Sequence, residues 1–299
     1  MSAPNRTLLA VLSCLLAATL WGTFWFPLRE IRDLGLPGLW ATLTIYVGAF
    51  LALLPWFWRR CSGLGEQLAG QPINLLAIAA GSGWANLAFI LAVLDGTVVR
   101  VLLLFYLAPM WTVLFGWLIL REHPDRSGVL TLLLAMTGGV IMLWPQQSDA
   151  LTSAISYADA LALSAGIAFA FNNVMIRRSG YLPLGFKMLA AYSGVLTLTI
   201  AAILLTGSAV PEAGPPGWLA AFVFGLLGMT VMTYTAQYGV THLPIYRSAV
   251  IFLFEIVAGA VSAWLLSDEI VHWREWLGGA LVITAAWQSA RAEQRRDIV

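Results

Sequence analysis

The sequence has few charged residues. Of its 299 residues, 16 are Lys or Arg and 15 are Asp or Glu, so charged residues make up 10% of the chain, against about 25% in an ordinary soluble domain. A soluble fold of this length needs polar groups to cover the surface that it cannot bury. The scarcity argues against a soluble enzyme. A net charge of +1 argues against a nucleic-acid binder, which needs a basic face, and 60% hydrophobic residues argue against a disordered chain.

Residues that bind metals, hydrolyse nucleotides or form disulfide frameworks are also scarce. The two cysteines, Cys14 and Cys61, lie in or beside apolar stretches, and two cysteines form neither a disulfide framework nor a metal cluster. The three histidines, His123, His242 and His272, lie far apart in the sequence. The chain contains no G-x-x-x-x-G-K-[ST] motif for nucleotide phosphates. We therefore expect no catalytic site, no metal and no cofactor, and any energy must come from an ion or solute gradient.

Long apolar segments fill most of the chain. Crossing a bilayer as a helix takes about 20 mostly apolar residues, and only helices satisfy all their backbone hydrogen bonds within one such segment. The sequence therefore predicts an all-α integral membrane protein with ten transmembrane helices. The ten segments are Leu8–Pro27, Leu36–Trp58, Ile73–Leu94, Val98–Leu120, Gly128–Trp144, Ala158–Ile176, Leu184–Leu205, Trp218–Tyr238, Pro244–Leu266 and Trp276–Ala290.

The basic residues predict the orientation of these spans. Ten spans put both termini on one side of the membrane, and most of the 16 basic residues fall on that side. The other side holds only Arg29, Arg32, Arg100 and Arg274. Because Lys and Arg concentrate in cytoplasmic loops, we expect a multi-pass protein of the bacterial inner membrane, with both termini in the cytoplasm.

The two halves of the chain repeat one another. At an offset of 147 residues several identities share one register and align Val98–Leu120 with Pro244–Leu266. The pairs are Gly81 and Gly228, Arg100 and Arg247, Trp117 and Trp264, Leu118 and Leu265, and Glu122 and Glu269. We therefore expect one transmembrane unit built from two five-helix repeats, residues 1–147 and 148–299. Since five is odd, the second repeat enters the membrane inverted. Inverted repeats suit a carrier with a site near the membrane centre that opens alternately to each side.

Sequence motifs add a resemblance to this interpretation. The segments WGTFWFPLRE, RVLLLFYLAPMWTVLFGWLILRE and IFLFEIVAGAVSAWLLSDE resemble the drug/metabolite transporter (DMT) superfamily, EamA type, over essentially the whole chain. The family pattern at the end of the fourth helix is matched by Tyr106, Ala108, Pro109 and Glu122, whereas Ile256 stands where Pro109 would repeat. Within the superfamily the chain looks most like bacterial exporters of aromatic amino acids. The resemblance implies export of small metabolites and a substrate region formed by helices one, three, four, six, eight and nine.

Polar residues within the spans are candidates for the transport path, because lipid-facing positions tolerate only apolar groups. Thr230, Thr233, Tyr234 and Gln237 recur on one face of the eighth span. Such a stripe either lines a cavity or bonds a neighbouring helix. Glu255 lies mid-span, where a carboxylate must be paired, hydrated or protonated. It can carry a proton, bind a substrate ammonium or act as a neutral structural donor.

Aromatic residues within the spans suit a substrate with a ring or an ammonium group, although each also suits ordinary helix packing. The deep aromatic candidates are Trp21, Trp25, Trp84, Tyr106, Phe169 and Phe171. Together with Thr230, Tyr234, Gln237 and Glu255 they form the predicted substrate-binding set. Gly22, Pro27 and Pro109 are predicted hinges, because proline removes a backbone hydrogen bond and glycine permits rearrangement.

These features together predict a secondary transporter of the inner membrane that exports amino acids, aromatic or bulky apolar ones above all, by alternating access through a central aromatic-lined cavity. We expect the lipid bilayer and a small-molecule substrate as its partners, no nucleic acid, and a monomer or weak oligomer. One alternative is an exporter of other small metabolites or cationic drugs on the same fold. A polytopic membrane enzyme or a passive channel would be a different class of protein.

The predicted topology can be tested with reporters. Alkaline phosphatase, which is active only outside the cytoplasm, should be inactive when fused after Val299 and active when inserted beside Ala150, because the charge bias places these positions on opposite sides. A cytoplasmic fluorescent reporter at the same sites should give the reverse pattern. Equal activity at both positions would contradict the inverted arrangement of the halves.

Overall fold

The computed structural model describes residues 3–60, 72–96, 98–144, 155–266 and 272–296. Helices account for all of the regular secondary structure in these ranges. The first half contains α1 (Ala3–Gly22), α2 (Trp25–Asp33), α3 (Gly38–Ala52), α4 (Leu54–Arg60), α6 (Pro72–Asp95), α7 (Val98–Phe105), α8 (Ala108–Phe115), the π-helix η1 (Gly116–Leu120) and α9 (Arg126–Leu143). The second half contains α11 (Tyr157–Arg178), α12 (Leu184–Thr206), α13 (Pro215–Phe224), the π-helix η2 (Gly225–Met229), α14 (Thr230–His242), α15 (Ile245–Phe252), α16 (Phe254–Leu266) and α17 (Trp273–Arg296).

The helices join into long apolar spans, which confirms the predicted fold class. Within the described residues, nine spans are long and apolar enough to cross a membrane. They are Arg6–Asp33, Gly38–Arg59, Pro72–Asp95, Arg100–Leu120, Arg126–Leu143, Tyr157–Arg178, Leu184–Thr206, Pro215–His242 and Ile245–Leu266. The tenth predicted segment, Trp276–Ala290, lies inside α17, a helix of 24 residues with charged residues in its first and last turns.

Three spans break beside a proline, which lacks a backbone donor: the first near Pro27, the second near Pro55 and the fourth near Pro109. An interior residue of an α-helix bonds the carbonyl four residues before it, and proline cannot do so. Pro27 leaves the carbonyl of Thr23 without this bond, and α1 ends at Gly22 while α2 begins at Trp25. Pro109 has the same effect on the carbonyl of Phe105, the last residue of α7. The ninth span breaks at Leu253, between α15 and α16, without a proline.

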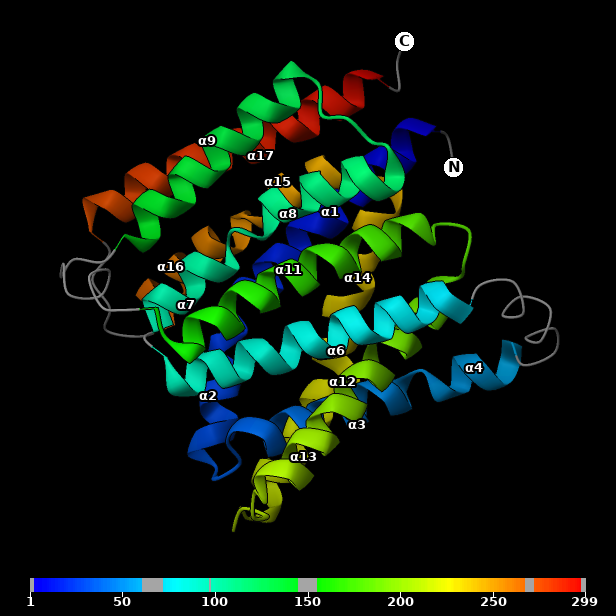
Figure 1. Ribbon diagram of the computed structural model, residues 1–299, viewed down its shortest axis with the longest axis vertical. Helices are drawn as coiled ribbons and strands as arrows, with labels where there is room; N and C mark the ends of the chain where they lie inside the picture. Colours follow the sequence, from blue (N-terminus) through cyan, green and yellow to red (C-terminus); the bar gives the residue numbers. More distant parts are fainter. Residues whose placement is uncertain (1–2, 61–71, 97, 145–154, 267–271, 297–299) are drawn as a thin grey trace.

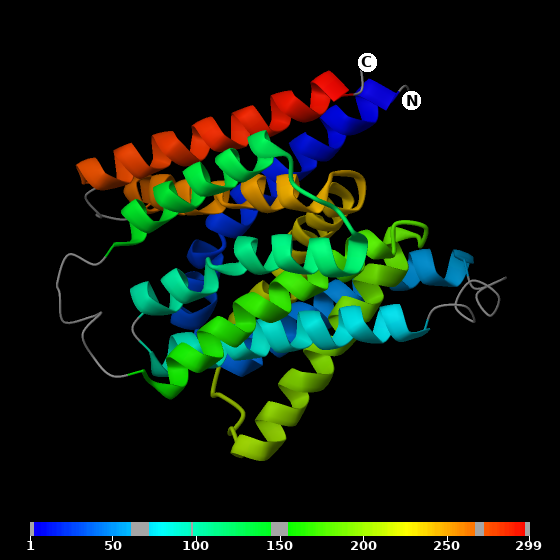
Figure 2. The ribbon, with the colours of Figure 1, turned by 45° about the horizontal axis from the view of Figure 1, so that its top comes forward.

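The arrangement of the helices repeats between the halves. Helices α7 and α15 each contain eight residues, and their bounds differ by the 147-residue offset of the sequence repeat. In the first half α6 packs against α11 and α12; its repeat mate, the span of η2 and α14, packs against α1 and α3. Helices α9 and α17 close each half and lie side by side at one edge of the molecule (Figures 1 and 2). Both termini lie at the same end (Figure 1).

Packing divides eight spans into two bundles that each take helices from both halves. We call α6, α7, α8, α11 and α12 the first bundle, and α1, α2, α3, α13, α14, α15 and α16 the second bundle. Small residues let membrane helices approach until their backbones touch. In the first bundle Gly83 lies against the carbonyl of Gly194, and Gly166 lies against the carbonyl of Phe105. In the second bundle Gly22 lies against the backbone of Glu255.

The packing of α9 on α17 yields a test with a matched control. A Cβ on Gly278 would lie 2.5 Å from the carbonyl oxygen of Gly138, whereas a Cβ on Gly279 would have only ordinary contacts at 3.8 Å or more. Gly278→Ala should therefore lower the free energy of unfolding by about 1–3 kcal/mol, as overpacking does. Gly279→Ala should be neutral or stabilising, because alanine favours helix. Thermal unfolding in detergent measures both, and equal melting temperatures would contradict this contact.

Candidate functional site

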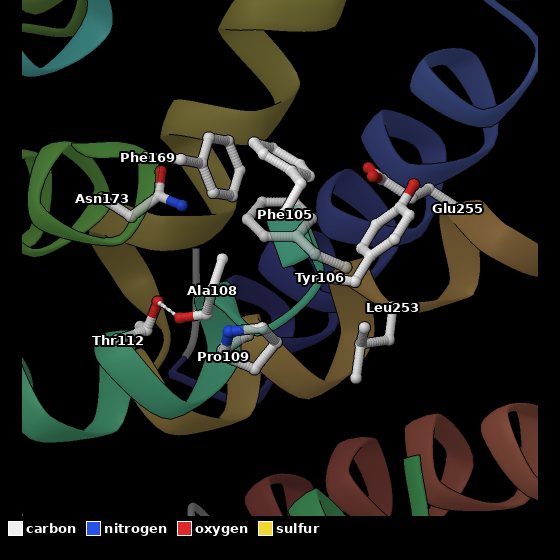
Figure 3. A pocket seen from close by; sticks show the side chains of 11 residues that line it. Phe105, Tyr106, Ala108, Pro109, Thr112, Phe169, Asn173, Leu253 and Glu255 are labelled. Atoms are coloured by element: carbon white, nitrogen blue, oxygen red, sulfur yellow. Dashed lines mark hydrogen bonds between the residues drawn. The ribbon is translucent and has the colours of Figure 1, made fainter. Parts of the chain in front are cut away.

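The breaks in the fourth and ninth spans face the same pocket. The pocket is small in this conformation, with a cavity volume of about 20 Å³, and lies between α7 and α8, α11, α15 and α16 (Figure 3). Its lining residues are Phe105, Tyr106, Ala108, Pro109, Thr112, Phe169, Asn173, Ala249, Phe252, Leu253 and Glu255. The fourth and ninth spans are repeat mates, so the pocket lies where corresponding parts of the two halves meet.

Glu255 and Tyr106 form the polar centre of the pocket. Their side chains point toward each other across the two halves of the chain (Figure 3), so that the Tyr106 hydroxyl faces the Glu255 carboxylate. The break at Leu253 places Glu255 in the first turn of α16. Backbone N–H groups at a helix start lack intrahelical partners and favour a negative charge. The helix break and the tyrosine together make a carboxylate tolerable at this depth.

Aromatic rings form the wall beside this pair. The centroid of the Phe105 ring lies 5.5 Å from that of Phe169, 4.8 Å from that of Phe89 and 5.6 Å from that of Tyr106. Asn173, a buried residue of α11, adds an amide group to the lining. A pocket with rings, an amide and one carboxylate can hold an ammonium group against the carboxylate and a flat apolar group against the rings.

Cations are absent from the described residues that line this pocket. Two arginines close in sequence to its lining residues are engaged elsewhere. Arg100 Nε lies 2.8 Å from Asp159 Oδ1, and this pair joins the starts of α7 and α11. Arg247 Nε lies 2.8 Å from Glu293 Oε2 and holds the start of α15 against α17. Glu255 is therefore the single charged group of the pocket lining.

The structure brings part of the predicted set into the pocket. Tyr106, Phe169 and Glu255 line it, and the predicted hinge Pro109 borders it at the start of α8. The other two predicted hinges, Gly22 and Pro27, flank the break between α1 and α2. Whether either break bends during transport stays a prediction.

The remaining aromatic candidates lie outside the pocket lining. Trp25 Nε1 donates to Ser262 Oγ at 2.9 Å, which joins α2 to α16, and Trp21 packs edge-on against Phe24. Trp84 is 42% exposed and donates to Ser164 Oγ on α11 at 3.2 Å.

Phe171 lies on the same helix as the pocket residue Phe169 but does not line the pocket. Its ring packs against that of Phe115 on α8, with the centroids 5.9 Å apart. A role in binding for Phe171 and for the three tryptophans stays a prediction.

The polar stripe of the eighth span lies mostly against a neighbouring helix. Tyr192 of α12 lies beside Thr230 and Thr233, and its hydroxyl donates to the carbonyl of Met229 at 3.3 Å. Gln237 on the same face is buried. Tyr234 is 49% exposed and its ring stacks on the next tyrosine of α14. The four residues of this stripe are not among the pocket-lining residues, and a role for them in lining a transport path stays a prediction.

Several lining residues were not in the predicted set, and the sequence repeat could have found two of them. Phe252 and Leu253 stand 147 residues after Phe105 and Tyr106. Once Tyr106 is a candidate, its repeat mates become candidates as well. Thr112 and Asn173 carry no comparable signal, because one polar residue on a helix also suits contact with another helix.

Both the sequence and the fold resemble those of known proteins. A model of the EamA-like transporter family matches residues 8–144 and again residues 156–289. A solved crystal structure of another protein superposes with a TM-score of 0.77 and 19% sequence identity, covering 96% of this chain and 97% of the other. At that identity the likeness shows the fold alone. No curated protein matches the chain.

The pocket carboxylate should control the binding of amines. Glu255→Gln removes the charge and keeps the shape, so the affinity for tryptamine should fall at least about tenfold, the expected loss of a charged hydrogen bond. Calorimetry on the purified protein in detergent measures this. The control is Glu212→Gln, which changes an exposed residue between α12 and α13. Equal affinity in Glu255→Gln and wild type would remove Glu255 from the site.

Proposed function

Since the chain belongs to the EamA-like transporter family, we propose that it is a secondary transporter that exports amino acids, aromatic or bulky apolar ones above all, by alternating access. The family consists of membrane transporters, so the chain is a multi-pass membrane protein that carries a small molecule and is not an enzyme. The amino-acid substrate, the bacterial inner membrane, the cytoplasmic termini and the monomeric or weakly oligomeric state are parts of the proposal.

One observation carries the choice of substrate, namely the Tyr106–Glu255 pair beside aromatic rings. An amino acid offers an ammonium group to the carboxylate, and an aromatic side chain offers a flat surface to Phe105 and Phe169. Both interactions gain strength where water is scarce. A nucleotide sugar would need cations for its phosphates, and the described pocket lining has none.

The packing supports a particular form of alternating access. The first and second bundles are each held by close backbone contacts, such as that of Gly83 on Gly194. The pocket lies between α7, α8 and α11 of the first bundle and α15 and α16 of the second. We infer that these intertwined bundles, rather than residues 1–147 and 148–299, rock against each other as rigid parts.

A second candidate substrate follows from the lone carboxylate. Because Glu255 is the only charged group among the described lining residues, the pocket also suits an aromatic amine without a carboxylate, such as a cationic drug. The two candidates differ only in whether the substrate carries an acid group. Three compounds that share one ring system but differ in charge can therefore distinguish them.

A competition experiment should identify the substrate's charge. Tryptophan is a zwitterion, tryptamine a cation and indole-3-propionate an anion, and all three share the indole ring. In proteoliposomes, unlabelled tryptophan and tryptamine should inhibit uptake of labelled tryptophan, and indole-3-propionate should not, because the Glu255 carboxylate repels an anion. Inhibition and uptake confined to tryptamine would favour the second candidate. Strong inhibition by the anion would contradict both.

Counterflow should separate a carrier from a channel. Proteoliposomes loaded with unlabelled tryptophan should transiently accumulate labelled tryptophan above the outside concentration, because a carrier's site faces one side at a time. A passive channel only equalises the label. Uptake that never overshoots and rises linearly with concentration would exclude alternating access.

A further inference from the structure

A second polar cluster lies at the end of the molecule where both termini are found. It joins Glu122, two residues after the end of η1, with Arg177 in the last turn of α11 and Ile245 at the start of α15. Arg177 Nε lies 2.9 Å from one Glu122 oxygen, and the Ile245 N–H donates to the other at 2.7 Å. These residues belong to the fourth, sixth and ninth spans, which also line the pocket. The cluster therefore lies where the pocket-lining helices end.

Lys187 is the chain's only lysine and is fully buried in this cluster. Its ammonium donates to Thr241 Oγ1 at 2.6 Å and to the carbonyl of Ile176 at 3.4 Å. No carboxylate of the described residues forms an ion pair with it. A buried charge without a counter-ion is unfavourable. The fold nevertheless retains a positive charge here, and its own side chains do not neutralise it.

Thr241 accepts hydrogen bonds from both cations of this cluster, Arg177 and Lys187. Its carbonyl accepts from Arg177 Nη1 at 2.6 Å, while its hydroxyl accepts from Lys187 and donates to the carbonyl of Gln237 at 2.6 Å. Arg177 and Lys187 belong to the first bundle, and Thr241 belongs to the second. If the two bundles separate at this end, Thr241 moves away from both cations. Arg177 and Lys187 then have a single carboxylate, that of Glu122, between them.

We propose that Arg177 and Lys187 form a binding station for the substrate's carboxylate at this mouth, and that Thr241 occupies the station while the mouth is closed. The inference rests on the proposed function, which supplies a zwitterionic substrate and makes this end the cytoplasmic one. The pocket provides a carboxylate for the ammonium group and lacks a cation for the acid group. The cytoplasmic cluster has the complementary excess of positive charge.

The two sites act in sequence. Glu122, just beyond the end of the fourth span, is sixteen residues from Tyr106, which is roughly 24 Å at 1.5 Å per helical residue. One amino acid cannot reach both sites. The station therefore receives the carboxylate as the substrate enters from the cytoplasm, and the pocket receives the ammonium group later. An entering amine without a carboxylate gains nothing from the station.

The test measures the Michaelis constant (KM) for two substrates in inverted membrane vesicles, whose outer face is the cytoplasmic one. For Lys187→Met the KM for tryptophan should rise about tenfold, the effect of losing one charge-assisted contact, while the KM for tryptamine stays within about twofold. Lys187→Arg should restore most of the tryptophan value. The control Arg178→Met changes an exposed neighbour of Arg177 and should alter neither KM.

The ratio of the two KM values decides the proposal, because it does not depend on the amount of folded protein. A tryptophan-to-tryptamine ratio equal to that of wild type would overturn the station and leave Lys187 with a structural role. If Lys187→Met does not insert into the membrane, Lys187→Gln keeps a polar side chain and must show the same rise in the ratio. If wild-type vesicles transport tryptamine but not tryptophan, the proposed substrate fails, and the station fails with it.

Discussion

Hydrocarbon offers no hydrogen-bond partner, and this constraint explains why the polar features of the molecule occur together. Polar side chains within the spans find partners on other helices, as Trp25 does on Ser262 and Tyr192 does on the carbonyl of Met229. A helix break frees backbone groups that lipid cannot satisfy, so breaks must face the protein interior. The breaks of the fourth and ninth spans do so. They bring a carboxylate and a tyrosine hydroxyl to one pocket between the bundles, and Asn173 of α11 adds an amide there.

Much of the fold could be predicted from the sequence because membrane insertion depends on segment length and charge. Nine of the ten predicted segments correspond to the spans found among the described residues. The repeat register found at Arg100 and Arg247 reappears in the matching bounds of α7 and α15. Prolines identified the breaks near Thr23 and Phe105. The break at Leu253 could not be predicted in this way, since Ile256 can donate a hydrogen bond. It donates to the carbonyl three residues back instead of four.

The candidate site was less predictable, because lipid exclusion says that a polar residue points inward but not which neighbour it meets. Glu255, Tyr106 and Phe169 were found from depth and residue type, and they line the pocket. Thr230 carried an equally strong signal, but it lies beside Tyr192 and donates its hydroxyl to the carbonyl of Gly225. The bundles were also hidden from the sequence. Each mixes helices from both halves, and the backbone contacts that hold them became visible only with the spans assembled.

The halves are not equivalent at their corresponding breaks. The fourth span has Ala108 and Pro109 where the ninth has Glu255 and Ile256. A transporter with two identical inverted halves would have inward- and outward-facing states of equal free energy, and so equal occupancy when empty. Under the alternating access that we propose, the proline and the carboxylate remove this equality, so the empty protein would spend more of its time in one orientation. Detailed balance limits the consequence: such a preference fixes where the unloaded protein rests, and the concentration gradients alone decide the direction of net flow.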